Sequence, residues 1–256
     1  MQAADQRLTA AYFAEVEAVA ERITGWLQPS EIRFLAMVAA LPTTRGTVVE
    51  LGAFSGKSSA VLAYGSRLTA QPGLISIDPY EQPDRRGFLQ HAGLDELVDF
   101  RQQYSGEFWQ GWHGPIRLLW HDGAIEREVV SADVQSALPH LADGAIVAFH
   151  DVRNTTGERL HPYCDQVLAS PHFGASGICG SIGWSQYHVD PEAARPHAAE
   201  KEHLLSRLRR LRPFHNLDRP RPLSRLAKMH YKLLRWCVPH RPVSVQQWRS
   251  LQRAAA

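Results

Sequence analysis

The chain has 256 residues, of which 44% are hydrophobic, which is enough to bury one large core. Its formal net charge is +2. Its three cysteines, Cys164, Cys179 and Cys237, are too scattered for a disulfide framework or a metal knuckle, and we expect a reducing, cytoplasmic environment. The first residues lack the basic start and apolar core of a signal peptide. No apolar run reaches the ~18 residues of a membrane-spanning helix.

The charge is distributed unevenly along the chain. Residues 1–200 carry 14 lysines and arginines against 24 acidic residues, whereas residues 201–256 carry 14 against 2. The change follows the last strand-like segment. We therefore predict a folded domain at 1–190, with 1–42 as a helical lead-in, and a basic extension at 191–256.

In chain order, the apolar spacing predicts a helix over 8–27, with Trp26 on its apolar stripe, and a second helix beginning at 29–31 with Ser30 as N-cap and ending before Pro42. Strands are then predicted at 47–51, 74–78, 98–102, 116–121, 145–149 and 183–189, and helices at 58–69, 84–97, 106–112, 127–141 and 158–169. This alternation is typical of an α/β fold, a Rossmann-like doubly wound, mostly parallel sheet with helices on both faces.

A glycine turn links the first predicted strand to a helix. The strand over residues 47–51 contains Glu50, the turn contains Gly52 and Gly56, and the next strand ends in Asp78. Glycine permits close approach of backbone to a ligand, and an acid after the second strand can bind both ribose hydroxyls of a nucleotide. Phe54 replaces the second glycine of a dinucleotide fingerprint, which disfavours a nicotinamide-dependent oxidoreductase without eliminating it.

Two later strands also end in acids. Asp122 follows the strand over 116–121, and Asp151 follows the strand over 145–149 directly after His150. The carboxyl ends of parallel strands are where ligands bind in such sheets. We therefore expect Asp122 and Asp151 to converge at one edge of the sheet.

These segments together resemble a known enzyme family. The glycine turn over 47–59 resembles motif I of class I S-adenosylmethionine (SAM) methyltransferases. The stretch over 116–123, Asp133, the stretch over 138–152, and the phrases over 77–81 and 104–106 resemble its cephalosporin-hydroxylase-like and macrolide-sugar O-methyltransferase branch. The resemblance covers about residues 29–173.

The resemblance implies a seven-stranded sheet, SAM as cofactor, and methyl transfer to a hydroxyl of a sugar, glycolipid or natural-product glycoside. The acceptor would be a small molecule or a glycan. The residues it implies for cofactor binding are Glu50, Gly52, Ser55, Gly56, Ser58, Asp78 and Ser105.

The resemblance also implies a catalytic set of Asp122, His150 and Asp151, with Asp122 and Asp151 as candidate ligands of Mg²⁺ or another divalent cation. A hard cation chelated by the acceptor would lower the pKa of the attacking oxygen. The alternative is that His150 and Asp151 cap the strand through hydrogen bonds without a metal.

One position departs from the family pattern. Ile125 stands where the family has the histidine expected to act as general base, and it cannot take a proton. Glu126, His150 and Asp151 remain as alternative bases. His121 alternates to the opposite side of its strand, where we expect it to be packed. The departure keeps open a second function, a SAM-binding assembly partner that has lost catalysis.

The basic extension contains two amphipathic segments. The segment over 204–212 puts Leu204, Leu208 and Leu211 on one stripe. In the segment over 223–237, one face carries the leucines Leu223, Leu226, Leu233 and Leu234. Another face carries the basic residues Arg225, Lys228, Lys232 and Arg235. Two aromatic residues, Tyr231 and Trp236, lie at amphipathic positions.

Two interpretations of this extension remain open. Such helices can lie on an anionic membrane, which would place the protein peripherally at the inner face. The alternative is packing on the catalytic domain or on a partner subunit of a homo-oligomer. Nucleic-acid binding is not expected, because no reader motif is present.

Overall fold

The computed structural model describes residues 7–218 and 223–254, and it centres on a seven-stranded sheet. The strands are β1 (Thr47–Leu51), β2 (Leu74–Ile77), β3 (Val98–Arg101), β4 (Ile116–His121), β5 (Leu141–Phe149), β6 (Phe173–Cys179) and β7 (Ile182–Tyr187). Their order is β3-β2-β1-β4-β5-β7-β6. The pairs among β1 to β5 are parallel, and β7 pairs antiparallel with both β5 and β6. The predicted Rossmann-like α/β fold is confirmed.

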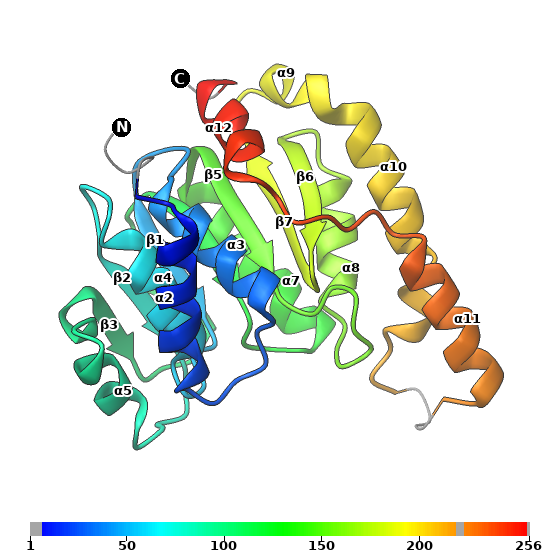
Figure 1. The fold of residues 1–256 in the computed structure, drawn as a ribbon. Helices are drawn as coiled ribbons and strands as arrows, with labels where there is room; N and C mark the ends of the chain where they lie inside the picture. The colour runs from blue at the N-terminus through cyan, green and yellow to red at the C-terminus, as the bar shows by residue number, and fades with distance from the viewer. Residues whose placement is uncertain (1–6, 219–222, 255–256) are drawn as a thin grey trace.

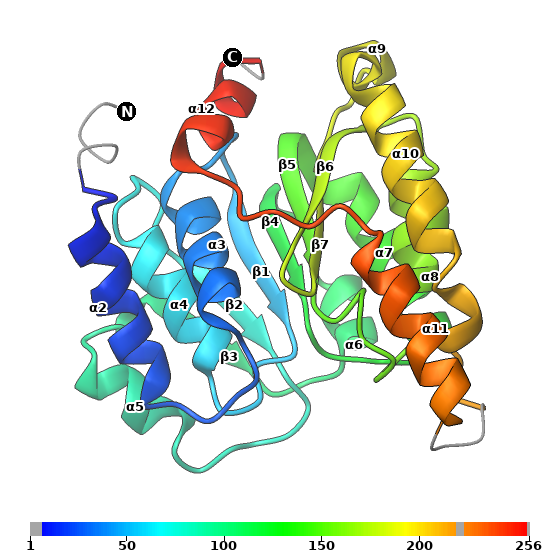
Figure 2. The same ribbon diagram turned by 45° about the vertical axis from the view of Figure 1, so that its right-hand side comes forward.

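Helices cover both faces of this sheet (Figures 1 and 2). One face carries α2 (Ala10–Glu21), α3 (Pro29–Ala40), α4 (Lys57–Ser66), α5 (Arg85–His91) and α12 (Val245–Ala254). The other carries α6 (Ser105–Gln110), α7 (Arg127–Ala137), α8 (Leu160–Pro162), α10 (Ala198–Arg209) and α11 (Arg225–Trp236). The four-residue α9 (Pro191–Ala194) precedes α10.

Alternation along the central strands builds a core on each face. In β1, Val48 packs into the core under α3 and α4, while Val49 packs into the core under α7. In β4, Trp120 and Leu119 divide in the same way. Both faces of a parallel sheet are covered, so these strands are mainly apolar, and the buried Glu50 and Arg117 are exceptions within β1 and β4.

The first helix is shorter than the predicted one. It ends at Glu21, and Trp26 then lies in a loop with 73% of its surface exposed, so its predicted place on an apolar stripe is wrong. The predicted N-cap of the next helix is also wrong, because α3 begins at Pro29 with Gln28 as N-cap. The Gln28 backbone N–H donates to Glu31 Oε2 at 2.8 Å, and this bond replaces a serine cap.

Strand β6 and helix α12 have no counterpart among the predicted elements, and one predicted helix has a different form. Strand β6 at the edge of the sheet was not predicted, because Gly174, Ser176 and Gly177 dilute its apolar pattern. The helix predicted over 158–169 is instead the short α8 followed by a π-helical turn, Tyr163–Leu168.

The basic extension packs against the sheet domain through α10 and α12. The leucines of α10 at positions 204, 205 and 208 are buried against the second core. Trp248 of α12 is fully buried between the rings of Phe34 and Trp184, and its indole N–H donates to the Leu41 carbonyl at 2.8 Å. The segment 237–244 therefore joins α11 on one side of the sheet to α12 on the other (Figure 2).

Helix α11 differs from its prediction. Leu226 and Leu233 are exposed while Leu234 is half-buried, so these leucines do not share one buried face. Tyr231 is buried on the domain and does not lie at an outer boundary. Among the described residues, no helix combines the length and the apolar character needed to cross a bilayer.

Candidate functional site

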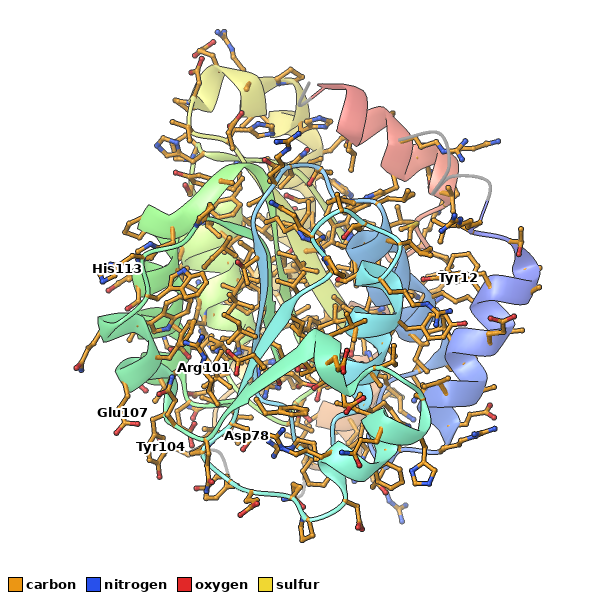
Figure 3. All side chains as sticks on the ribbon, turned by 90° about the vertical axis from the view of Figure 1, so that its left-hand side faces the viewer. Tyr12, Asp78, Arg101, Tyr104, Glu107 and His113 are labelled. Carbon is orange, nitrogen blue, oxygen red and sulfur yellow. The ribbon has the colours of Figure 1, made fainter. Side chains whose placement is uncertain are left out.

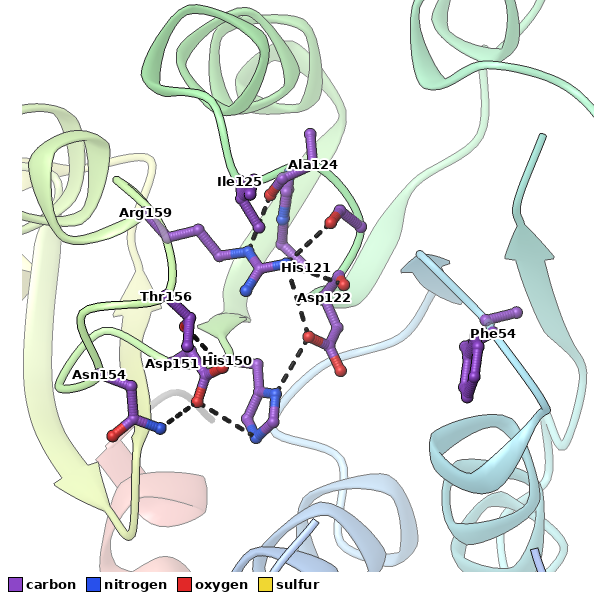
Figure 4. Close-up of polar contacts among 12 residues, drawn as sticks. Phe54, His121, Asp122, Ala124, Ile125, His150, Asp151, Asn154, Thr156 and Arg159 are labelled. Atoms are coloured by element: carbon purple, nitrogen blue, oxygen red, sulfur yellow. Dashed lines mark hydrogen bonds and ion pairs between the residues drawn. The ribbon is translucent and has the colours of Figure 1, made fainter. Parts of the chain in front are cut away.

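The predicted site residues gather at the carboxyl edge of the sheet, where β1, β4 and β5 lie side by side. The Asp122 backbone N–H donates to the Leu51 carbonyl at 2.8 Å, and the His150 N–H donates to the His121 carbonyl at 3.0 Å. These bonds extend the strand pairing past the strand ends. They bring the chain after β4 beside the turn after β1 and beside the chain after β5 (Figure 4).

The turn after β1 requires glycine at Gly52. Its φ is +91°, and a Cβ there would lie 2.4 Å from Gly123 Cα. Gly56, with φ +88°, is the N-cap of α4. The candidate cofactor turn is therefore in direct backbone contact with the segment carrying Asp122.

Asp78, directly after β2, is fastened to this turn. Its Oδ2 accepts the backbone N–H groups of Ala53 and Phe54 at 3.0 and 2.8 Å, and its Oδ1 accepts the Tyr80 N–H at 2.9 Å. A carboxylate has about four acceptor positions, so room for a ribose hydroxyl remains on Oδ1. Figure 3 shows Asp78 and Tyr104 at the same lower edge of the molecule.

Arg85 links the turn after β1 to the segment after β2. Its guanidinium donates to the carbonyls of Phe54 and Tyr80, both at 2.7 Å, and lies 3.8 Å from Asp78. Nothing in the sequence analysis pointed to Arg85, which lies in a helix outside the motifs. Only tertiary packing brings it onto the turn.

Glu50 lies beneath the turn and is fully buried. Its Oε2 accepts hydrogen bonds from Ser59 and Ser76, both at 2.5 Å, which ties β1, α4 and β2 together. Burial raises the pKa of this carboxyl to about 7, against the hydrogen bonds from its serine neighbours. Direct contact between Glu50 and a cofactor stays a prediction.

Two of the three predicted serines lie in or next to the turn, and the third follows β3. Ser55 is half-buried within it, Ser58 is buried in the first turn of α4, and Ser105 begins α6 after β3. All three follow or adjoin the carboxyl ends of β1 and β3. Their contact with such a ligand stays a prediction.

His150 lies between three carboxylates. Its Nδ1 is 3.0 Å from Asp122 Oδ1 and its Nε2 is 3.9 Å from Asp151 Oδ1 (Figure 4). The same Nε2 is 3.5 Å from Glu31 Oε2. A carboxylate only accepts hydrogen bonds, so both ring nitrogens are placed as donors. Burial disfavours the charged ring, but the bonds to Asp122 and Glu31 outweigh it and raise the pKa of His150 to about 10. With both ring nitrogens directed at carboxylates, His150 is placed to orient Asp122 and Glu31.

Arg159 adds a second cation that the sequence analysis missed. Its Nε donates to the Ala124 carbonyl at 2.8 Å, and its Nη2 donates to the carbonyls of Asp122 and Gly123 at 3.0 and 2.8 Å. The same Nη2 is 3.7 Å from Asp122 Oδ1. Asp122 is thus oriented from both sides, and its Oδ2 accepts no hydrogen bond from the described residues.

The residues do not fit a divalent cation. Asp151, in a left-handed conformation with φ +59°, accepts hydrogen bonds from Asn154 and Thr156, and the His150 ring separates it from Asp122. Within the described ranges, no three histidine, cysteine or acidic side chains are grouped to hold a metal. His150 and Arg159 occupy the positions beside Asp122 Oδ1 where a cation would supply positive charge.

The neighbourhood of Ile125 leaves few candidate bases. Glu126 is exposed, and its Oε2 accepts the Ile125 N–H at 3.1 Å. His121 is fully buried on the opposite side, where its Nε2 is 3.0 Å from Asp133 Oδ2, as its alternation predicts. The base is therefore to be sought among the carboxylates of the edge.

An open pocket of about 600 Å³ lies at the other edge of the sheet. Gly46, Thr47, Leu74, Val98 and Pro115 line it, at the amino-terminal ends of β1 to β4. It contains none of the predicted site residues. In parallel sheets the carboxyl ends carry the ligand sites, and we assign no function to this pocket.

Comparison with known proteins agrees with this architecture. Residues 49–152 match the family model described as a methyltransferase domain. The protein Rv0187 from MTB, in a cofactor-bound structure, is 18% identical with a TM-score of 0.54, over 71% of this chain and 92% of that one. An O-methyltransferase from Bacillus cereus, in complex with SAH, is 17% identical with a TM-score of 0.52, over 70% and 91%.

A third solved structure is similar to the same extent. The O-methyltransferase TomG from Streptomyces achromogenes, involved in tomaymycin synthesis and in complex with SAM, is 15% identical with a TM-score of 0.52, over 70% and 91%. At these identities the structures establish the shared fold. Taken with the family match over the glycine turn, β4 and β5, they show that the chain contains a methyltransferase domain of the class I fold.

Proposed function

We propose that this protein is a SAM-dependent O-methyltransferase that acts on a hydroxyl of a sugar, a glycolipid or a natural-product glycoside. One observation carries the proposal: the Asp122 backbone lies directly against Gly52 while His150 and Arg159 orient its carboxylate, in a domain that matches a methyltransferase family. The SAM- and SAH-bound O-methyltransferases of the same fold support the cofactor and the reaction. The sugar acceptor rests on the resemblance of the motifs.

The reaction needs alignment more than activation of the cofactor. SAM carries a methyl group on a positively charged sulfur; the acceptor oxygen forms a bond to the methyl carbon while the carbon–sulfur bond breaks. The electron pair goes to sulfur, which becomes a neutral thioether, and the hydroxyl proton goes to a base. The protein's part is to hold oxygen, carbon and sulfur in line and to place the base.

Asp122 is the proposed base. Its Oδ1 is held by His150 and Arg159, which leaves Oδ2 to accept a hydrogen bond, and then a proton, from the acceptor hydroxyl. Asp78 would hold the ribose, and the turn containing Gly52, Ser55 and Ser58 would face the methionine part. His150 and Arg159 position Asp122 and do not touch the reacting atoms.

A SAM-binding partner without catalysis is the second candidate, favoured by Ile125 at the position of the family histidine. The two candidates differ in turnover and share cofactor binding. Mass spectrometry of ligand released from the denatured protein, with calorimetry of SAM and NADH, tests the shared part. NADH binding without SAM binding would overturn both.

Turnover is tested with methyl-labelled SAM and a panel of glycosides and glycolipids, with and without a chelator. Asp122→Asn should keep SAM binding and lower kcat by roughly 10²–10⁴-fold, the usual contribution of a general base. Glu126→Gln is the matched control and should retain activity. An active Asp122→Asn enzyme, or activity abolished by chelation, would contradict the proposed role of Asp122.

A further inference from the structure

Helix α11 is fastened to the domain by one side. Tyr231 is buried, its ring lies 5.2 Å from that of Phe214, and its hydroxyl donates to the Arg153 carbonyl. In return, Arg153 Nη2 donates to the Arg235 carbonyl at 3.1 Å. Arg153 follows Asp151 by two residues, so α11 is anchored directly beside the candidate active site.

The opposite side of α11 exposes an apolar stripe. Leu226, Met229, Leu233 and Trp236 are 73%, 65%, 59% and 76% exposed. Their spacing of three, four and three residues puts them on one face of the helix. Four large apolar side chains on one exposed face are typical of a surface that binds a protein, a ligand or a membrane.

The flanking charges indicate what is bound. Arg225, Lys228 and Lys232 are exposed beside the stripe, and the sequence from 223 to 254 contains no acidic residue. A second copy meeting this face through its own α11 would place like charges against each other. A partner surface complementary to this face of α11 would offer apolar groups to the stripe and negative charges to the basic side chains beside it.

We propose that α11 docks the protein on an anionic phospholipid surface. Its 12 residues are about 18 Å long at 1.5 Å per residue, which suits a helix lying in the plane of the interface and is too short to cross a bilayer. The four apolar side chains enter the boundary between headgroups and acyl chains, and the basic side chains face the phosphates. Figure 2 shows α11 on the outer side of the molecule, where a flat surface can reach it.

The docking does not depend on methyl transfer. The anchoring of α11 to Arg153 places the membrane beside the carboxyl edge of the sheet. Only the consequence for the acceptor, which would be offered from the membrane, rests on the proposed function.

Vesicle sedimentation of the full chain tests the proposal. Binding should appear on phosphatidylcholine vesicles containing phosphatidylglycerol, be absent on pure phosphatidylcholine, and weaken as salt rises. The double variant Lys228→Glu/Lys232→Glu should bind at least ~tenfold more weakly, because each basic residue near the surface contributes about fivefold. Arg22→Glu/Arg45→Glu changes the net charge equally at two exposed sites on the α2–α3 side and should bind like the original protein.

The apolar stripe is tested separately with Leu226→Ser/Leu233→Ser. This variant keeps every charge and should also lose binding, while its thermal unfolding stays unchanged because both side chains are exposed. Equal loss in the Arg22/Arg45 control, or full-length protein that ignores anionic vesicles at low salt, would overturn the proposal. So would a concentration-dependent dimer that the leucine variant dissociates, since α11 would then bind a second copy.

Discussion

At the scale of single residues, the site depends on charges that hold one another in place. Asp78 binds three backbone N–H groups, and His150 bridges Asp122 and Glu31. Burial opposes ionisation of Glu31, but the bonds from His150, Gln28 and Ser181 outweigh it and keep the Glu31 pKa below its usual value. Each of these carboxylates therefore shapes the site before any ligand binds.

Replacing Asp78 with alanine should weaken SAM binding. The variant loses the hydrogen bond offered to the ribose and releases the N–H groups of Ala53 and Phe54, at about 1–3 kcal/mol in total. Calorimetric titration with SAM measures the change. Asp99→Ala, an exposed acid on β3, is the control, and an Asp78→Ala protein of unchanged affinity would contradict the assignment.

Glu50 predicts a pH dependence of stability. Its folded pKa of about 7 is above the ordinary 4.5, so the folded state binds the proton more tightly than the unfolded state. This stabilisation is present below pH 4.5 and is lost as the pH rises through 7. The difference is on the order of 3 kcal/mol at pH 7.

Glu50→Gln should remove that dependence. The free energy of unfolding of the original protein, measured by denaturant titration, should fall relative to the variant between pH 4.5 and 7. Parallel pH profiles of the two proteins would show that Glu50 titrates normally.

At the scale of elements, the turn between β1 and α4 is the most constrained part of the site. Gly52 combines a positive φ with the backbone of Gly123 where its Cβ would lie. The turn thus fixes the distance between the candidate cofactor and Asp122. Side chains cannot supply this contact.

Gly52→Ala should destabilise the protein by roughly 1–3 kcal/mol from backbone strain alone, and it should reduce SAM affinity as the turn moves away from Gly123. Thermal unfolding and calorimetry measure the two effects. Gly111→Ala is the control, because a Cβ there meets no atom within 4 Å. Equal melting temperatures for the two variants would contradict the close approach.

At the scale of the whole molecule, the extension forms part of the fold as well as a candidate docking surface. The chain leaves α11, passes to the other face of the sheet, and inserts Trp248 between Phe34 and Trp184. The lead-in helix α3 and the last helix are thereby packed together. Helices from the early and the late part of the described chain therefore share one core.

Trp248→Ala should therefore cost about 3–5 kcal/mol of stability, as for other buried aromatic residues. Trp236→Ala removes the same side chain from an exposed position and should leave unfolding nearly unchanged. Differential scanning calorimetry of both variants gives the comparison. Similar melting temperatures would mean that α12 does not dock in solution.

Local signals were sufficient for the alternation of strands and helices, and the site that they indicate stays a prediction. Residues 47–51 and 116–121 are strands with the predicted bounds, because strands buried on both faces are mainly apolar. Strand β6 and the shortened α2 were missed, since diluted apolar runs and loops after a helix carry weak local patterns. The observed helices differ from the predicted ones mostly in the residues at which they begin and end.

The sequence by itself determined the α/β alternation, the glycine turn and the acids after β2, β4 and β5, because backbone conformation and burial act through neighbouring residues. Only the tertiary structure decided how those acids are used. Glu31, Arg85 and Arg159 come from distant segments, and they set the charge around Asp78, Asp122 and His150. Electrostatic interactions depend on distance in space, and no spacing along the chain records that distance.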